Sequence, residues 1–575
     1  MVFIIYLFLL LSLISFGLYP SELMYKYSLV LFAFVGIYLL IRFIRHQPIY
    51  IPLWLLPIPL LYLFTLFFGV ESVQGTLDQF LVWSTVIAFG VLVIHLKNPS
   101  QQLPLILTAL SWTMIIGTYF ILIKIISFPH FILPLSKELS GLGERLGGFL
   151  QYPNAFASFL AAIILFHLVQ AMKESKKHLY FLHSFIVLPA WPLFLLTESR
   201  GAWLLFAAVW VMSFYVVSAN RHVQYFLLSS FMISGGTLLY MLFTLSGTIK
   251  ITFLSIISLM FLGVIVWIGD RFNVLEKVPN LKNRHIFPLA LIVFIVLTVS
   301  DLYWKGLFYR ILPDSLQRRL GFDVGTFSER VLYWKDSLEH WEQFTWIGLG
   351  GKAWQLFMYR IQSSPYLTSE VHNSFINIWI EIGIVGLIYV CIILIKVGYR
   401  LWRSHAAAFP AFLFLLIHGM LEFTFSYPFF LLFLLCLLVT PKKLELSSLR
   451  NKMAISISFI LLVSGAWLSY QFINADSAYK AANSSLTREE AQQWILQAID
   501  KNAWETDYVR FAVENELVIG DKKLRLLEQS LQYEPNHAWL LYQAGKAAEE
   551  TGDFKKAEDY YELSKENNRY PNRRN

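Results

Sequence analysis

The feature that most constrains this chain is a series of apolar runs, each close to the roughly 20 residues that an α-helix needs to cross a bilayer. Hydrophobic residues make up 57% of the 575 residues and charged residues only 15%, so these runs dominate the chain. The predicted fold class is all-α, a polytopic transmembrane helix bundle of about 15 spans. The predicted spans cover residues 2–19, 28–44, 51–70, 79–96, 103–126, 154–172, 179–197, 201–219, 223–245, 249–269, 286–304, 373–395, 406–423, 427–440 and 453–471.

The loops between these spans alternate in charge. Every second loop carries Lys or Arg, whereas loops such as "ESVQGTLD" and "FTFSYP" carry neither. Cytoplasmic loops collect positive charge, so the net charge of +8 indicates orientation in a membrane and not a nucleic-acid partner. The N-terminus is predicted to be cytoplasmic. The basic loop residues are Arg42, Arg45, Lys97, Lys173, Lys176, Lys177, Arg221, Arg271, Lys277, Lys282, Arg284, Lys396, Arg400, Arg403, Lys442, Lys443, Arg450 and Lys452.

Hydropathy also divides the chain into four predicted parts. Residues 1–304 hold spans 1–11, residues 305–371 form a large extracytoplasmic loop with amphipathic helices, residues 372–473 hold spans 12–15, and residues 474–575 form an extracytoplasmic helical tail. The first apolar run lacks a basic leader, so we predict a span there and no cleaved signal peptide. The two cysteines, Cys391 and Cys436, lie in apolar runs and are expected to be core residues, not a disulfide or a metal site.

The tail has the pattern of a helical repeat. Within "PNHAWLLYQAGKAAEETGDFKKAEDYYELSK", the residues Gly545, Ala557, Tyr561 and Ser564 occupy the small and aromatic positions of a tetratricopeptide unit. One unit cannot bury its own apolar face, so the helices before it are expected to stack against it. An ordinary helical hairpin is the alternative. Because helical arrays often present concave surfaces, a protein partner for the tail is a further hypothesis.

Residues able to do chemistry gather in the loops of the predicted outer face. Each alone has a structural explanation, since an Arg at a span boundary often anchors in the headgroups and a His at a helix start often caps it. The glycine-rich "WIGLGGKAW" is too short for a phosphate-binding loop and is predicted to be a tight turn. Their common side of the membrane favours a shared site. The candidates are Arg145, Asn154, Ser199, Arg200, Arg330, His372 and Asn373.

The segments that hold these residues resemble the O-antigen ligase and polymerase superfamily. The resemblance lies in "RLGGFLQYPNAFA" from Arg145 to Ala157, in Ser199-Arg200, and in "SERVLYWKDSL", "GLG" and "HNSFINIWIEIGIVGL". Members of this superfamily are multi-span bacterial membrane glycosyltransferases with a large extracytoplasmic loop between two late spans. The tail is a departure that simpler ligases lack.

The resemblance implies a donor glycan joined through a diphosphate to a polyprenyl lipid such as undecaprenol, and transfer at the outer face of the bacterial plasma membrane. Arginine can neutralise a departing diphosphate without a metal, so Arg145, Arg200 and Arg330 are the expected diphosphate clamp. No D-x-D occurs in the chain, which argues against a metal-dependent nucleotide-sugar transferase. We expect no cofactor and no metal. Asn154, Ser199 and Asn373 are further candidate substrate-binding residues.

An acceptor hydroxyl needs a general base, and histidine, with an ordinary pKa near 6.5, suits that task at neutral pH. His372 is the candidate. On a continuous helix, residues 372, 379, 383 and 386 would fall within roughly 40° of one another, so His372, Trp379, Gly383 and Gly386 are predicted to form one stripe. The two glycines would then admit a neighbouring helix.

Glu381 would lie nearly opposite His372 on such a helix, and is predicted to be a buried group satisfied by another span. Asn373 could cap the helix or bind a sugar hydroxyl, and the cap is the preferred interpretation.

Two other classes of function are alternatives to the enzyme, namely a transporter and a membrane-anchored scaffold. A transporter or flippase for a lipid-linked glycan would show broken helices, paired halves and ionisable residues near the midplane. Here the ionisable residues within spans are few, chiefly Glu381, His418 and Glu422, and no internal repeat is apparent. A membrane-anchored scaffold would not need so many spans. Within the enzyme class the acceptor stays open: a lipid, a growing polysaccharide or a protein.

Overall fold

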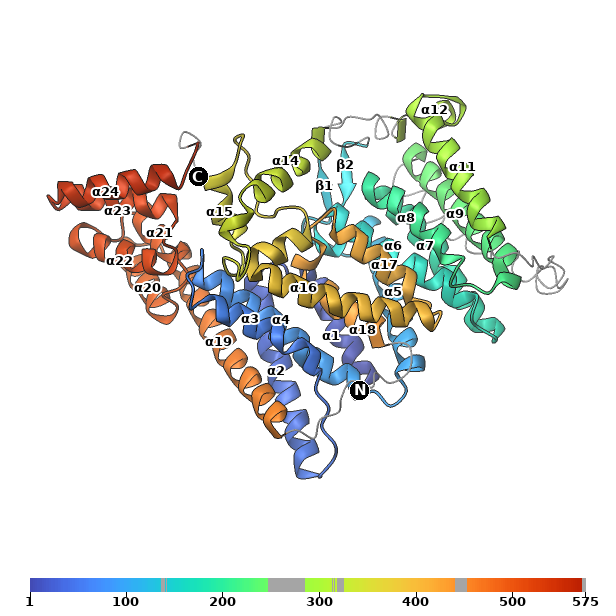
Figure 1. The fold of residues 1–575 in the computed structure, drawn as a ribbon, viewed down its shortest axis with the longest axis horizontal. Helices are drawn as coiled ribbons and strands as arrows, with labels where there is room; N and C mark the ends of the chain where they lie inside the picture. Colours follow the sequence, from blue (N-terminus) through green and yellow to red (C-terminus); the bar gives the residue numbers. More distant parts are fainter. Residues whose placement is uncertain are drawn as a thin grey trace.

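The structure is a computed structural model that describes residues 1–135, 140, 142–246, 285–312, 314, 316–317, 325–439 and 452–570. Its described part is almost entirely helical, with one short antiparallel pair formed by β1 (Ile132–Pro134) and β2 (Glu144–Leu146) (Figure 1). The predicted all-α class is confirmed.

Fourteen of the fifteen predicted spans coincide with apolar helices, and eight helices within the described residues are long and apolar enough to cross a membrane. The remaining span, 249–269, lies outside the described residues, as do Arg271, Lys277, Lys282, Arg284, Lys442, Lys443 and Arg450. The helices are α1 (Val2–Ile14), α2 (Ser21–Ile44), α3 (Pro57–Thr65), α4 (Val73–Ile94), α5 (Pro99–Leu122), α6 (Pro153–Ala171), α7 (Lys177–Leu196), α8 (Arg200–Ser213), α9 (His222–Ser246), α11 (Ile286–Tyr303), α16 (Ser374–Arg403), α17 (Ala408–Gly419), α18 (Pro428–Val439) and α19 (Lys452–Ser484).

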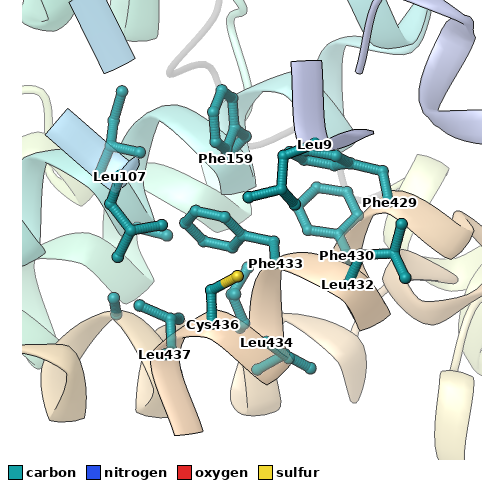
Figure 2. Packing of buried hydrophobic residues seen from close by; sticks show 14 of the residues in the cluster. Leu9, Leu107, Phe159, Phe429, Phe430, Leu432, Phe433, Leu434, Cys436 and Leu437 are labelled. Atoms are coloured by element: carbon teal, nitrogen blue, oxygen red, sulfur yellow. The ribbon is translucent and has the colours of Figure 1, made fainter. Parts of the chain in front are cut away.

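The centre of the bundle is α18, whose twelve residues are all buried. A helix that is apolar on every face must be surrounded by other helices, and α18 packs against α1, α4, α5 and α17. Figure 2 shows Phe429 and Phe433 beside Phe159 of α6, with ring centroids 5.2 and 5.4 Å from Phe159 in edge-to-face geometry. Cys436 projects its sulfur into the same cluster, so its predicted place in the core is confirmed.

Helix α16 is broken near its start. Ile382 and Gly383 leave helical geometry, and Gly383 has φ +67°. A side chain at Gly383 would collide with the backbone of Trp346, because the loop at 345–352 packs directly against the break. The loop amides of Leu349 and Gly350 donate to the carbonyls of Ile380 (2.8 Å) and Glu381 (3.0 Å). These bonds satisfy the carbonyls that the break would otherwise leave unpaired.

The loop before α16 carries short helices along one edge of the molecule. These are α12 (Leu307–Ile311), α14 (Gly325–Glu339) and α15 (Trp354–Ile361). In Figure 1, α14 and α15 lie along the same edge as β1 and β2, although the strands come from a loop far earlier in the chain. This arrangement brings the predicted outer-face residues to one region.

The tail is a helical layer that begins without a break from the last apolar helix. Helix α19 continues through the predicted boundary at residue 474, and Ala475, Ala478 and Ala482 belong to the hydrophobic core of the tail. The tail helices are α20 (Arg488–Lys501), α21 (Asp507–Glu514), α22 (Gly520–Tyr533), α23 (Ala538–Glu550) and α24 (Phe554–Glu566). Gly545 of α23 faces the ring of Tyr561 of α24. The tetratricopeptide assignment stays a prediction.

Buried polar contacts hold the tail against the membrane helices. Glu534 accepts hydrogen bonds from Ser72 (2.7 Å), at the start of α4, and from Thr506 (2.6 Å) in the tail. Asn502 donates to Gln74 of α4 at 3.0 Å. The backbone amide of Arg569 donates to the carbonyl of Tyr359 in α15 at 3.1 Å. The tail is therefore packed on the rest of the chain and not tethered loosely to it.

Candidate active site

The candidate site is organised by Glu422, which lies in the turn between α17 and α18. Its Oε2 is 3.1 Å from Nδ1 of His372 and accepts the Tyr152 hydroxyl at 3.1 Å. Its Oε1 accepts Nδ2 of Asn154 at 2.5 Å and forms an ion pair with Nη2 of Arg330. One carboxylate thus joins side chains from three other segments of the chain.

The carboxylate is held in its ionised form. Burial acts to raise the pKa of Glu422, but the hydrogen bond from His372 and the charge of Arg330 outweigh it and lower the pKa to about 2. The Glu422 side chain is only 5% exposed, whereas His372 is 19% and Arg330 23% exposed. A ligand can therefore reach the imidazole and the guanidinium but not the glutamate that holds them.

His372 lies just outside α16, in a left-handed conformation with φ +55°. Asn373 caps the helix, because its Oδ1 accepts from the amides of Phe375 (3.0 Å) and Ile376 (3.1 Å). The preferred interpretation of Asn373 as a cap is confirmed. The indole of Trp334 in α14 donates to the carbonyl of His372 at 3.3 Å, which ties the loop to α14.

The predicted stripe of His372, Trp379, Gly383 and Gly386 is wrong. It assumed one continuous helix, but the helix starts after His372 and breaks at Gly383. Gly383 admits the loop at Trp346, and a side chain at Gly386 would meet Ile382 of the same helix, so neither glycine receives a neighbouring helix.

Glu381 is satisfied away from His372, as predicted. Its Oε2 accepts the Tyr62 hydroxyl of α3 at 2.6 Å, and its Oε1 accepts the Lys352 amide at 2.9 Å and Asn377 at 3.3 Å. The partner span is α3, and the other two donors come from the loop at 345–352 and from α16 itself.

Arg145 reaches the same site from β2. Its Nη2 donates to Oδ1 of Asn154 at 2.8 Å, and its Nε donates to the carbonyl of Thr197 at 2.8 Å. Since Asn154 also bonds Glu422, the predicted residues Arg145, Asn154, Arg330 and His372 belong to one connected network.

Ser199 and Arg200 lie at the border of this network. Ser199 is buried at the N-cap of α8, and Arg200 is the first residue of that helix. The preceding Glu198 is buried and accepts from Ser140 (2.8 Å) and from the amide of Leu142 (3.1 Å), in the loop before β2. The turn is joined to the network by the carbonyl of Thr197, which accepts the hydrogen bond from Arg145 Nε.

Two residues of the site were not among the sequence candidates, namely Glu422 and Tyr152. Glu422 was noted only as an ionisable residue inside a predicted span. The helix α17 ends at Gly419, so Glu422 lies in the turn beyond it. A carboxylate in the short apolar loop "LEFTFSYP" was the available signal. Tyr152 had none, since a Tyr before a helix start is common at membrane interfaces.

Among the residues that the structure describes, no three His, Cys, Asp or Glu side chains are grouped to hold a metal ion. The charged groups that could meet an anionic ligand are the guanidinium groups of Arg145 and Arg330. The network therefore places fixed guanidinium groups next to the partly exposed imidazole of His372.

Comparison with known proteins agrees with this arrangement. Residues 185–391 match the family model described as Wzy_C, O-Antigen ligase. This segment runs from α7 to α16 and includes Ser199, Arg200, Arg330, His372 and Asn373. A comparison with curated proteins found no match. Residues 185–391 therefore hold an O-antigen ligase domain, in a chain whose long apolar helices are those of a multi-span membrane protein.

Proposed function

We propose that the protein transfers a glycan from a polyprenyl diphosphate carrier to an acceptor hydroxyl at the outer face of the bacterial plasma membrane. The O-antigen ligase domain supports the coarser assignment, a ligase- or polymerase-type membrane glycosyltransferase. The observation that supports this specific transfer reaction is the carboxylate of Glu422, which holds His372 and Arg330 side by side.

His372 is the proposed general base. An ionised Glu422 can only accept hydrogen bonds, so the Nδ1 that faces it carries the proton in the neutral imidazole. Nε2 then has the free electron pair and can take the proton of the acceptor hydroxyl. The acceptor oxygen bonds to the anomeric carbon of the donor as the bond from that carbon to the diphosphate oxygen breaks.

The arginines are the proposed stabilisers of the leaving group. The electron pair of the broken bond stays on the diphosphate, whose negative charge grows during the step. Fixed guanidinium donors match phosphate oxygens and act best where water is excluded. Arg330 and Arg145 lie in the network around Glu422, and Arg200 starts the adjacent helix. No metal is required for this chemistry.

The break in α16 is the feature most like a transporter. In transporters, unwound backbone carbonyls are free to coordinate an ion. Here the carbonyls of Ile380 and Glu381 are occupied by amides of the 345–352 loop. This pairing favours a structural role for the break and the enzyme over the flippase.

The decisive experiment supplies the purified protein with an undecaprenyl diphosphate glycan and candidate acceptors, and identifies the glycosylated product by mass spectrometry. A lipid, a polysaccharide chain or a protein are the three acceptors to be offered. His372→Ala should lower transfer by about 10²- to 10⁴-fold, the usual contribution of a general base. His340→Ala, directly after the end of α14, is the matched control. Transfer that survives His372→Ala would remove this residue from the mechanism.

A further inference from the structure

A cavity with a volume of about 520 Å³ lies between the tail and the large loop. One wall is α15 together with residues 367–369, and the other is α21 with the start of α23. We propose that this cleft binds the acceptor as a chain of sugars, and so holds the growing or receiving glycan while its terminal hydroxyl reaches His372. The proposal rests on the proposed function for the identity of the reaction.

The lining has the chemistry that sugars require. Tyr359 and Trp539 are partly exposed rings, and sugars present apolar C–H faces that pack on such rings. Thr368, Ser369 and Asn536 supply hydroxyl and amide groups that can bond the sugar hydroxyls. A pocket that is mostly apolar with a few placed polar groups is the usual form of a small-ligand site.

The cleft has little net charge. Arg510 is the one arginine of the lining, and its Nε donates to Glu514 at 2.9 Å while its guanidinium lies 5.5 Å from the centroid of Trp539. Burial and the charge of Arg510 lower the pKa of His537 to about 4, so this residue is neutral at physiological pH. The buried Nδ1 of His537 has no hydrogen-bond partner among the described residues. These features suit a hydroxyl-rich, uncharged ligand better than an anionic one.

The two walls are fixed to each other before any ligand arrives. The Tyr570 hydroxyl donates to the carbonyl of Ser363 at 2.8 Å. Arg360 pairs with Glu71, and Asn536 bonds the same carboxylate at 3.2 Å. A preformed cleft loses less ordering entropy on binding than a mobile one.

The cleft also leads toward the candidate base. Ser369 in its wall precedes His372 by three residues, so their Cα atoms lie within about 11 Å. The Tyr19 ring, 38% exposed, lies between them, with its hydroxyl 3.4 Å from Ser369 Oγ. Tyr19 adjoins Phe423 (6.2 Å), whose ring in turn contacts His372 edge to face at 5.0 Å. A chain that extends from the cleft would thus meet a further ring before the base.

The test measures binding of a fluorescently labelled oligosaccharide, released by mild acid from the surface polysaccharide of the host, to the full-length protein in detergent without donor. Trp539→Ala and Tyr359→Ala should each weaken binding about tenfold. Gln355→Trp, which fills the cleft from an exposed position on α15, should do the same without touching the core. The matched control is Trp494→Ala, a 37% exposed tail residue outside the cleft.

The outcomes separate this proposal from the proposed function. His372→Ala should bind the oligosaccharide normally while losing transfer, and the cleft variants should raise KM for the acceptor with kcat unchanged. Unchanged binding in Gln355→Trp and Trp539→Ala would overturn the cleft proposal and leave the mechanism at His372 intact. Binding of a Ser/Thr-rich peptide in place of the oligosaccharide, lost in the same variants, would also overturn it and assign the cleft to protein acceptors.

Discussion

Two glutamates, Glu422 and Glu381, are both buried but have different surroundings. Glu422 is bonded by groups that carry or can carry charge, Arg330 and His372, and both remain partly exposed. Glu381 is bonded by neutral donors, the Tyr62 hydroxyl, the Asn377 amide and a backbone amide of the loop.

The bonding partners of the two glutamates show how a candidate active site can be distinguished from a structural site within one membrane protein. A carboxylate surrounded by neutral donors fixes packing, because its partners have no charge or proton to exchange at neutral pH. A carboxylate that orients an accessible imidazole and guanidinium can tune both for a ligand. The partners, and not the burial of the acid itself, distinguish the two roles.

The sharpest way to test this contrast is to neutralise each acid without changing its volume. Glu422→Gln should lower transfer by at least about 10²-fold, because the amide NH2 can donate to Nδ1 of His372 and so move the imidazole proton to Nε2, where it blocks the base. Glu381→Gln should change transfer by less than about tenfold, since its neutral donors can also bond an amide oxygen. Initial rates and a pH–rate profile on both purified variants make the comparison.

A change in the pH–rate profile for Glu422→Gln only would support its role as a positioning residue. Equal losses in both variants, with equal losses of thermal stability, would mean that the two glutamates differ in partners but not in role.

A smaller effect is expected from the two arginine pairs. Arg330→Lys should lower transfer by about tenfold, because a lysine keeps the charge but loses the planar, two-pronged geometry that matches phosphate. Arg360→Lys, which keeps a positive charge to pair with Glu71 at the wall of the cleft, should leave kcat unchanged. Steady-state kinetics with the lipid-linked donor would show the difference. A loss in Arg360→Lys as large as in Arg330→Lys would argue against a special role for Arg330.

The structural side of the comparison can be tested at the break beside Glu381. Gly383→Ala should lower the free energy of unfolding by about 1–3 kcal/mol, because its positive φ and the nearby Trp346 backbone exclude a side chain. Gly36→Ala is the control, since that position on α2 has open space around it. Thermal unfolding in detergent measures both. If Gly383→Ala leaves the free energy of unfolding unchanged, the backbone at the break can shift to accommodate a side chain.

A pH-dependent effect on stability is expected at Glu370, which lies in the loop before α16. Burial and the nearby charge of Glu381 raise the pKa of Glu370 to about 8. An acid with a raised pKa in the folded state loses stability as pH rises from its unfolded pKa toward that value. Glu370→Gln should therefore gain stability over the wild type between about pH 5 and pH 8, by no more than about 1.4 kcal/mol per pH unit. Melting curves of both proteins across this pH range test the prediction. A difference in stability that does not change with pH would contradict the raised pKa of Glu370.

The spans could be predicted from sequence because a bilayer imposes a simple length and composition on each helix. The break in α16 could not, since "IEIGIVGL" is apolar apart from Glu381 and the cause lies in a loop more than thirty residues earlier. The start of the same helix could be predicted, because Asn373 has the chemistry of a cap, and a cap at Asn373 places His372 outside the helix.

The site was predictable in part for a related reason. Arginine and histidine at the boundary of a span are conspicuous because hydrocarbon penalises charge. Glu422 was not selected because its importance comes from its partners, which are distant in sequence: Asn154 and Arg330 come from other elements. Composition and spacing carry no information on such convergence. Tyr152 shows the same limit, since its role depends on facing Glu422.

The break at Gly383 affects how α16 becomes complete when the protein inserts into the bilayer. The apolar stretch after the break, from Ile384 to Ile395, is only about 18 Å long at 1.5 Å per residue, because basic residues begin at Lys396. It is too short to cross the ~30 Å core without the residues before the break. Those earlier residues need amides of the 345–352 loop to pair their carbonyls, and this loop precedes α16 in the chain. The span is therefore complete only when the loop has packed against the first half of α16.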